Sequence, residues 1–254
     1  MHHGLAVGPL VPASVKTVKD YLAWAKANPK DASYGSPAAG STPHFIGALL
    51  GINNGVDLKH VPYRGSVPGV TDVVGGQLAS MVTPSGDFLQ YHRAGRLRLL
   101  TTSGKERSPF SPQVPTFVER GCAELTTKEW FGFYGPAKTS ATVVATANAA
   151  INAALKDKSV IDSLAITGLI ARGSTIDEMA ASQKTEFDRW GPLVKKTGLP
   201  LSLDNRTTQR VIICLCIAAS APSAARPPIH RAVRRRLTPR FWNHCWVTTR
   251  GGRR

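Results

Sequence analysis

Residues 32–83 constrain the fold more than any other part of this 254-residue chain. Short apolar runs lead here into turns rich in glycine, serine and proline, and a helical pattern follows each turn. The three pieces read Ala32-Ser-Tyr-Gly-Ser-Pro-Ala-Ala-Gly-Ser-Thr-Pro-His44, His60-Val-Pro-Tyr-Arg-Gly-Ser66 and Gly75-Gly-Gln-Leu-Ala-Ser-Met-Val-Thr83. This alternation predicts an α/β fold, in which helices cover both faces of a mainly parallel sheet.

The same periodicities extend the prediction along the chain. Apolar runs predict strands at 32–34, 56–61, 78–83, 97–102 and 130–134. Helices are predicted at 14–28, from 41 onwards, at 68–74, 86–92, 141–155 and 159–166, and from 175 to about 197. Ser41 is a suitable N-cap with Pro43 in the first turn, and Thr175-Ile-Asp-Glu178 forms a capping box. The apolar residues expected on one face of this last helix are Ile176, Met179, Phe187, Trp190 and Val194.

The formal net charge of +16 suggests a nucleic-acid binder until it is divided along the chain. Residues 204–254 contain 11 of the 32 basic residues, all of them arginine, and a single acid, Asp204. Three of the four cysteines also lie there, and Cys122 is the fourth. This tail has two interpretations: a basic arm that binds nucleic acid, or the product of an abnormal reading frame.

The turn before Ser41 is the first candidate site. A strand, a small-residue loop and a helix start would present free backbone N–H groups and the positive end of a helix dipole. Ser36, Ser41 and Thr42 add hydroxyl donors, so a carboxylate would fit; a plain helix cap would give the same spacing. His44 can bond the loop or a ligand, with a structural role preferred. Tyr63 lies in the next turn, where it could line a pocket or simply pack. Arg64 beside it is a possible carboxylate partner, although arginines in turns usually face solvent.

Catalytic and metal sites find little support in the sequence. The histidines show no i,i+4 pairing and the body of the chain has no cysteine pair, so no zinc site is predicted. No Gly-x-Ser-x-Gly motif occurs in the body. The acids Asp72, Asp87 and Glu129 are scattered, with no pattern that pairs an acid with a base. We therefore expect neither an enzyme nor a cofactor, and we expect Trp130, Phe131 and Phe133 to pack in the core or at a hinge.

Eight motifs, in order over about residues 5–200, make the chain resemble the Bug or TctC family, the substrate-binding proteins of tripartite tricarboxylate transporters. They are Tyr34-Gly-Ser…Gly40-Ser-Thr-Pro-His44, Val61-Pro-Tyr-Arg-Gly-Ser66, Thr71-Asp-Val-Val-Gly-Gly-Gln77, Gly95-Arg-Leu-Arg98, Arg107-Ser108, Val114-Pro-Thr-Phe-Val-Glu119, Trp130-Phe-Gly-Phe-Tyr-Gly-Pro136 and Trp190-Gly…Gly198. The resemblance implies a periplasmic-binding-protein-like (type 2) clamshell that captures a small organic acid and delivers it to membrane permease subunits. It implies a carboxylate site at Ser36, Gly40, Ser41 and Thr42, with His44 beside it. The adjacent loop would add Tyr63, Gly65 and Ser66, and Thr83 to Ser85 would complete the wall.

The resemblance also predicts a domain layout. Residues 1–10 are expected to be a remnant N-terminal segment, 11–128 the second lobe, 129–203 the C-terminal part of the first lobe, and 204–254 an atypical tail. The family's signal peptide and its Pro-Gly-Gly half-lobe have no counterpart here. The expected location is thus periplasmic by resemblance, and cytoplasmic if the chain is expressed as written. With one side of the clamp absent, we expect organic acids to bind weakly or not at all.

Two other classes of function stay open at this point. A ligand-sensing regulatory domain shares the two-lobed design, but it would need a helix-turn-helix segment, which is not apparent. A protein that binds nucleic acid through its arginine-rich tail would show salt-dependent binding to DNA. We do not expect nucleic acid to be a partner, because most of the net positive charge belongs to the tail.

Overall fold

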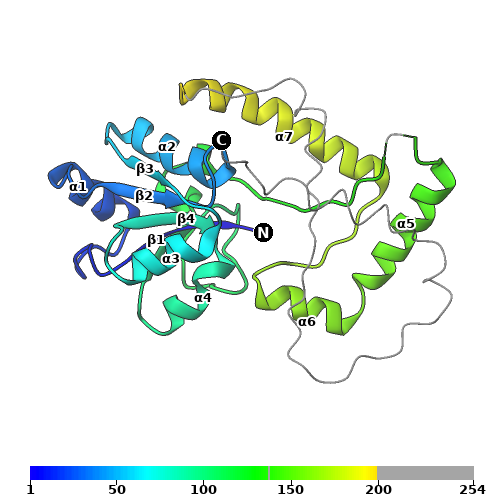
Figure 1. Cartoon of the computed structure of the whole chain (residues 1–254), viewed down its shortest axis with the longest axis horizontal. Helices are drawn as coiled ribbons and strands as arrows, with labels where there is room; N and C mark the ends of the chain where they lie inside the picture. The colour runs from blue at the N-terminus through cyan, green and yellow to red at the C-terminus, as the bar shows by residue number, and fades with distance from the viewer. Residues whose placement is uncertain (137, 199–254) are drawn as a thin grey trace, which may run out of the picture. The chain divides into compact units, whose positions relative to one another are not determined.

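A computed structural model of the chain describes residues 1–136 and 138–198. Its elements are strands β1 His3–Val7, β2 Ser33–Ser36, β3 Lys59–Pro62, β4 Ser80–Pro84 and β5 Arg98–Thr102; helices α1 Val18–Ala27, α2 Thr42–Asn54, α3 Ser66–Val74, α4 Gly86–Arg93, α5 Ala141–Ala154, α6 Lys158–Ile166 and α7 Ile176–Lys196; and short 3₁₀ helices at Val118–Arg120 and Ala123–Leu125. Figure 1 shows their order along the chain. The predictions for residues 204–254 lie outside the described residues.

The sheet has five strands in the order β3-β2-β4-β1-β5. β2 pairs in parallel with β3 and β4, whereas β1 pairs antiparallel with both β4 and β5. Four strands therefore run in one direction and β1 runs against them. No strand was predicted in residues 1–10, but the structure places β1 there with every residue buried.

Helices cover both faces of the sheet, as predicted. Alternate strand residues point to opposite faces, so Leu5 and Val82 join a core with α1, α2 and Phe117. Ala6 and Met81 join the opposite core with α3 and α4. The confirmed fold class is thus mixed α/β with one open sheet.

Local capping decides where several helices begin. The helix predicted at 14–28 begins later than expected: Thr17 caps α1, because its hydroxyl accepts from the Asp20 N–H at 3.1 Å while Asp20 accepts from the Thr17 N–H at 2.9 Å. Ser41 caps α2 as predicted, and Thr175 and Glu178 form the predicted capping box of α7. In α1 and α7 the reciprocal pair satisfies two backbone donors at the helix start.

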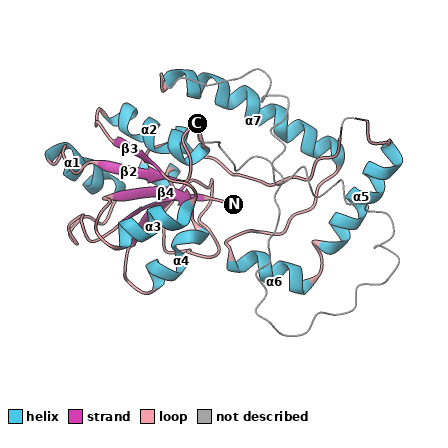
Figure 2. Cartoon of the chain, viewed as in Figure 1, coloured by secondary structure: helices cyan, strands magenta, loops and turns pink. Residues whose placement is uncertain are grey.

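The predicted strand at 130–134 is wrong. Residues 130–136 have no regular secondary structure, and Figure 2 shows all strands of the described residues within the one sheet. A strand needs a neighbour for its backbone groups, and none lies beside this segment among the described residues. Core packing is also wrong for Phe131 and Phe133, which are 44% and 66% exposed.

Helix α7 packs against the core of the sheet near its C-terminal end. Val194 is buried, and Trp190 and Leu193 pack against the core of α1 and α2. Phe187 and Ile176, predicted on the same apolar face, are exposed. No helix among the described residues is long and apolar enough to cross a membrane.

Candidate functional site

The predicted site residues gather at one edge of the sheet. Ser36 ends β2, Tyr63 follows β3, and Thr83 and Ser85 lie at the end of β4. Because these strands are parallel and adjacent, their carboxyl ends meet. His3 joins them, since antiparallel β1 places it opposite Pro84. This edge is where open α/β sheets bind ligands.

The hydroxyls of Ser36 and Ser41 are used inside the loop that they belong to. Ser36 is fully buried, donates to the Ala38 carbonyl at 3.0 Å and lies 2.7 Å from His60 Nε2. Ser41 donates to the same carbonyl at 2.7 Å and caps α2. These two side chains therefore shape the loop, and the site has fewer free hydroxyls than the spacing suggests.

Gly40 forms the exposed turn of this loop. Its φ of +74° lies in the left-handed region, and a Cβ there would meet no atom within 4 Å. Its N–H donates to His44 Nδ1 at 2.9 Å, so His44 bonds the loop, one of the two roles that the sequence left open for it.

At the start of α2, the Thr42 N–H has no hydrogen-bond partner among the described residues. The loop thus presents a backbone donor at a helix start.

His44 and His60 stack beneath the loop. Their ring centroids are 3.6 Å apart and the rings are nearly parallel, at 12°. Burial lowers the pKa of His44. Burial, and then the neighbouring His44, lowers the pKa of His60 to about 4. Both rings are therefore neutral near pH 7, as the accepting role of His44 Nδ1 toward Gly40 requires.

The loops after β3 and β4 form the second part of the edge. Gly65, with a φ of +99°, donates its N–H to the Pro37 carbonyl at 2.8 Å and so ties the two loops together. Tyr63 donates to Asp72 at 2.8 Å. Thr83 lies 2.7 Å from the Ser66 hydroxyl and donates to Asp87 at 3.0 Å.

Two further predicted residues differ in exposure. Ser85 is buried, and its N–H donates to the His2 carbonyl at 2.9 Å. Arg64 is exposed, which agrees with the expectation that an arginine in this turn faces solvent. Ser85 therefore joins the loop after β4 to the first residues of the chain.

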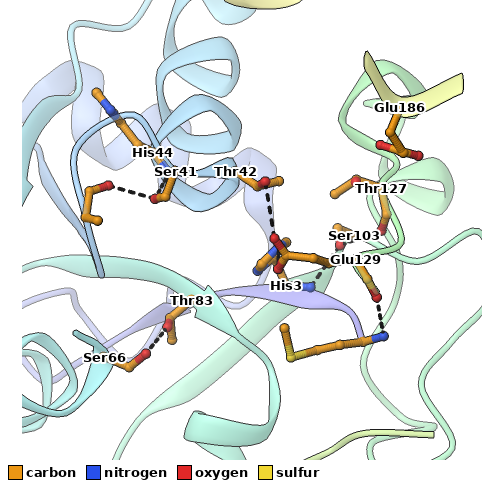
Figure 3. Close-up of polar contacts among 12 residues, drawn as sticks. His3, Ser41, Thr42, His44, Ser66, Thr83, Ser103, Thr127, Glu129 and Glu186 are labelled. Carbon is orange, nitrogen blue, oxygen red and sulfur yellow. Dashed lines mark hydrogen bonds and ion pairs between the residues drawn. The ribbon is translucent and has the colours of Figure 1, made fainter. Parts of the chain in front are cut away.

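Glu129 belongs to this edge, and sequence reasoning missed it. Its Oε2 lies 2.7 Å from His3 Nε2, and its Oε1 accepts from the Thr42 hydroxyl at 3.4 Å (Figure 3). Burial raises the pKa of Glu129, but His3 and Thr42 outweigh that effect, so the net pKa lies below its usual value. A carboxylate therefore faces the loop that was predicted to bind one. No spacing signal could have found it, because Thr42 and Glu129 are 87 residues apart.

Ser103 fixes the backbone around Glu129. Its buried hydroxyl accepts from the His3 N–H at 2.9 Å and donates to the Thr127 carbonyl at 2.9 Å. The Thr127 N–H donates to the Ser103 carbonyl at 2.7 Å, and the Glu129 N–H donates to the Met1 carbonyl at 3.0 Å. Three segments distant in sequence are thereby joined beside the site.

No cluster of three or more potential metal ligands occurs among the residues that the structure describes. A groove elsewhere on the protein is lined by α1 and by the segment after α2, including Leu22, Lys26 and Val56. It shares no residue with the candidate site.

The chain matches the family described as "Tripartite tricarboxylate transporter family receptor" over residues 2–199. It is 32% identical over 180 residues to protein BugT of Bordetella pertussis, covering 71% of this chain and 55% of BugT. The structure is similar to R. palustris Rpa4515 with adipate, with a TM-score of 0.71 and 28% identity, covering 78% of this chain and 65% of that one. It is also similar to MatC of Rhodopseudomonas palustris with bound malate, with a TM-score of 0.66 and 25% identity, covering 76% and 66%.

The chain therefore spans about half the length of BugT and about two thirds of the two solved chains. Members of the matched family are solute-binding proteins, and the two neighbours hold dicarboxylic acids. The family match extends over both the sheet and the helices α5 to α7. On this basis the chain belongs to the tripartite tricarboxylate transporter receptor family of solute-binding proteins, the Bug or TctC family.

Proposed function

We propose that this chain is the ligand-binding part of a receptor that captures a small organic acid for a tripartite tricarboxylate-type transporter. The observation that carries the proposal is the loop of Gly40 to Thr42 at the carboxyl edge of the sheet. Its glycine has a left-handed φ, and its Thr42 N–H has no hydrogen-bond partner among the described residues. Neighbours of the same family with bound adipate and malate support a carboxylate as the ligand class. We propose no catalytic role.

The proposed ligand site comprises the loops after β2, β3 and β4. The Thr42 N–H and the dipole of α2 would hold the carboxylate, at about 1.5–3 kcal/mol for a hydrogen bond to a charged group. Ser36, Ser41 and His44 would act by holding the loop in shape. Tyr63, Gly65, Ser66, Thr83 and Ser85 would form the adjacent wall.

We expect the 254-residue chain to bind weakly. All these residues come from one edge of one sheet. A wall on the opposite side of the ligand would raise the affinity about tenfold for every 1.4 kcal/mol that it contributes. Calorimetric titration with L-malate and adipate should therefore give a Kd well above the micromolar range. Micromolar binding would contradict this expectation, and the absence of any binding up to tens of millimolar would contradict the proposed function.

A matched pair of glycine variants tests where the acid binds. Gly40 and Gly95 both have a positive φ, of +74° and +68°, and neither has an atom within 4 Å of an added Cβ. Gly40→Ala and Gly95→Ala should therefore cost a similar 1–2 kcal/mol or so of backbone strain. Only Gly40→Ala should weaken the binding of L-malate, by tenfold or more. Equal weakening by both variants would place the site elsewhere.

We also propose a periplasmic location and delivery of the acid to the membrane permease subunits of the transporter. The family match and the solved chain titled "Structure of a periplasmic transporter", 34% identical to this one, support this proposal. Fractionation of a native host with an antibody to this chain should recover it with periplasmic markers. Cross-linking should join it to the permease, more so with the acid present.

A further inference from the structure

We infer that Glu129 selects among the organic acids, favouring those that carry a hydroxyl or ammonium group beside the carboxylate over plain dicarboxylates. The inference rests on the proposed function, since it concerns the same site. It names the ligand class more narrowly: 2-hydroxy and 2-amino acids.

The geometry leaves one weakly bonded acceptor, Glu129 Oε1, beside the loop of Gly40 to Thr42. Glu129 Oε2 is committed to His3, at 2.7 Å from Nε2. Among the described residues, Oε1 has only the long contact of 3.4 Å with the Thr42 hydroxyl. Thr42 is the first residue of α2, where a carboxylate held by the helix start would lie. Any substituent next to that carboxylate would come within reach of Oε1.

The carboxylate of Glu129 is held in place. His3, which is 1% exposed, lies in the sheet between β4 and β5, and its Nε2 contacts Oε2 at 2.7 Å. Backbone bonds join Glu129 to Met1 in both directions, at 2.7 and 3.0 Å. The side chain is nevertheless 33% exposed, so a ligand can reach it. A fixed and accessible carboxylate has the properties of a recognition group.

The chemistry of that group decides the ligand class. An ionised carboxylate only accepts hydrogen bonds. A hydroxyl or ammonium group of the ligand would satisfy Oε1, whereas a second carboxylate at the same place would be repelled. Hydrogen bonds to charged groups are about twice as strong as those between neutral groups. Among acids of equal length, the donor-bearing ones should therefore bind more tightly.

Three four-carbon acids test the inference because they differ at one substituent. Succinate has hydrogen at carbon 2, L-malate a hydroxyl and L-aspartate an ammonium group. NMR titration of the 254-residue chain should give a Kd for succinate about tenfold above those for L-malate and L-aspartate, equivalent to roughly 1.4 kcal/mol. In Glu129→Gln, which keeps the shape and removes the charge, this ratio should fall to near one.

A control variant and the wild-type ratio make the result decisive. Glu124→Gln is the same chemical change away from the site: Glu124 lies in the 3₁₀ helix Ala123–Leu125 and accepts from Asn53, near the C-terminal end of α2, at 2.8 Å. It should leave the ratio of the Kd values for succinate and L-malate unchanged. If Glu129→Gln does not fold, as judged by circular dichroism, the wild-type ratio alone decides. Succinate binding as tightly as L-malate would overturn the inference and leave the proposed function standing. No binding of any acid would overturn both.

Discussion

Residues 1–129 and residues 138–198 obey the same local rules and differ in burial. In the first region both faces of the sheet are covered, and all buried hydrophobic residues of the described chain except Val194 lie there. In the second region α5 and α6 bury no residue. Their caps are nevertheless well formed: Ser140 accepts from the Val143 N–H and Asp157 from the Ser159 N–H.

The difference shows that capping and periodicity define a helix, whereas a core needs a second surface. Exposed apolar side chains in the second region include Val143, Ile161, Ile166, Ile170, Ile176 and Phe187. Helices as short as α6 are marginal without packing. Stability should therefore reside in the first region, and the following predictions test that division.

The largest difference is expected between two phenylalanines. Phe117 is fully buried, and Phe187 is 78% exposed. Phe117→Ala should lower the free energy of unfolding by about 3–5 kcal/mol, because it removes buried surface and leaves a cavity. Phe187→Ala should change it by less than about 0.5 kcal/mol. Urea unfolding followed by fluorescence checks both, and comparable losses would break the distinction between the regions.

Two serine caps provide a smaller effect. Ser41 and Ser140 each accept from the backbone N–H three residues on, both at 3.4 Å. Ser41→Ala should cost about 1 kcal/mol of global stability, because α2 is part of the core. Ser140→Ala should reduce helical circular dichroism and leave the unfolding midpoint of the first region unchanged. A shift of that midpoint by Ser140→Ala would couple the two regions.

The smallest effect is expected from the protonation of buried histidine, which concerns the first region because residues 138–198 contain no histidine. The folded pKa of His60 is about 4, against about 6.5 unfolded, so the unfolded chain binds more protons between these values. Stability should fall as the pH drops from 6.5 towards 4, by about 0.5–1 kcal/mol after allowing for the partly exposed ring.

His60→Gln isolates this contribution from those of His44 and His2, whose pKa values are also lowered. Urea unfolding at pH 7 and pH 4.5 should show a smaller loss for the variant than for the wild type. An equal loss in both proteins would assign the acid sensitivity to the other groups.

Local signals predicted much of the fold and tertiary contacts decided the rest. The Ser41 cap and the Thr175 capping box are properties of a few neighbouring residues, and both were predicted correctly. The segment at 130–134 looks like a strand from composition, but a strand forms only where a partner accepts its hydrogen bonds. β1 was missed because its role depends on β4 and β5, which lie far along the chain.

The candidate site shows the same limit. The sequence placed Ser36, Tyr63 and Thr83 at the ends of strands, and parallel pairing brought them to one edge. It could not indicate that Ser36 bonds His60 or that Thr83 bonds Asp87. Glu129 looked like a scattered acid, and only the fold brings it to His3 and Thr42.

The central claim is that a small organic acid binds at the carboxyl edge of the sheet. Residue-resolved NMR of the isotope-labelled 254-residue chain, titrated with L-malate, tests it most directly. Amide shifts should be largest at Gly40, Ser41, Thr42 and Glu129, and Gly95 should stay unchanged. Shifts centred on the groove near Lys26 and Val56, or confined to residues 138–198, would contradict the claim.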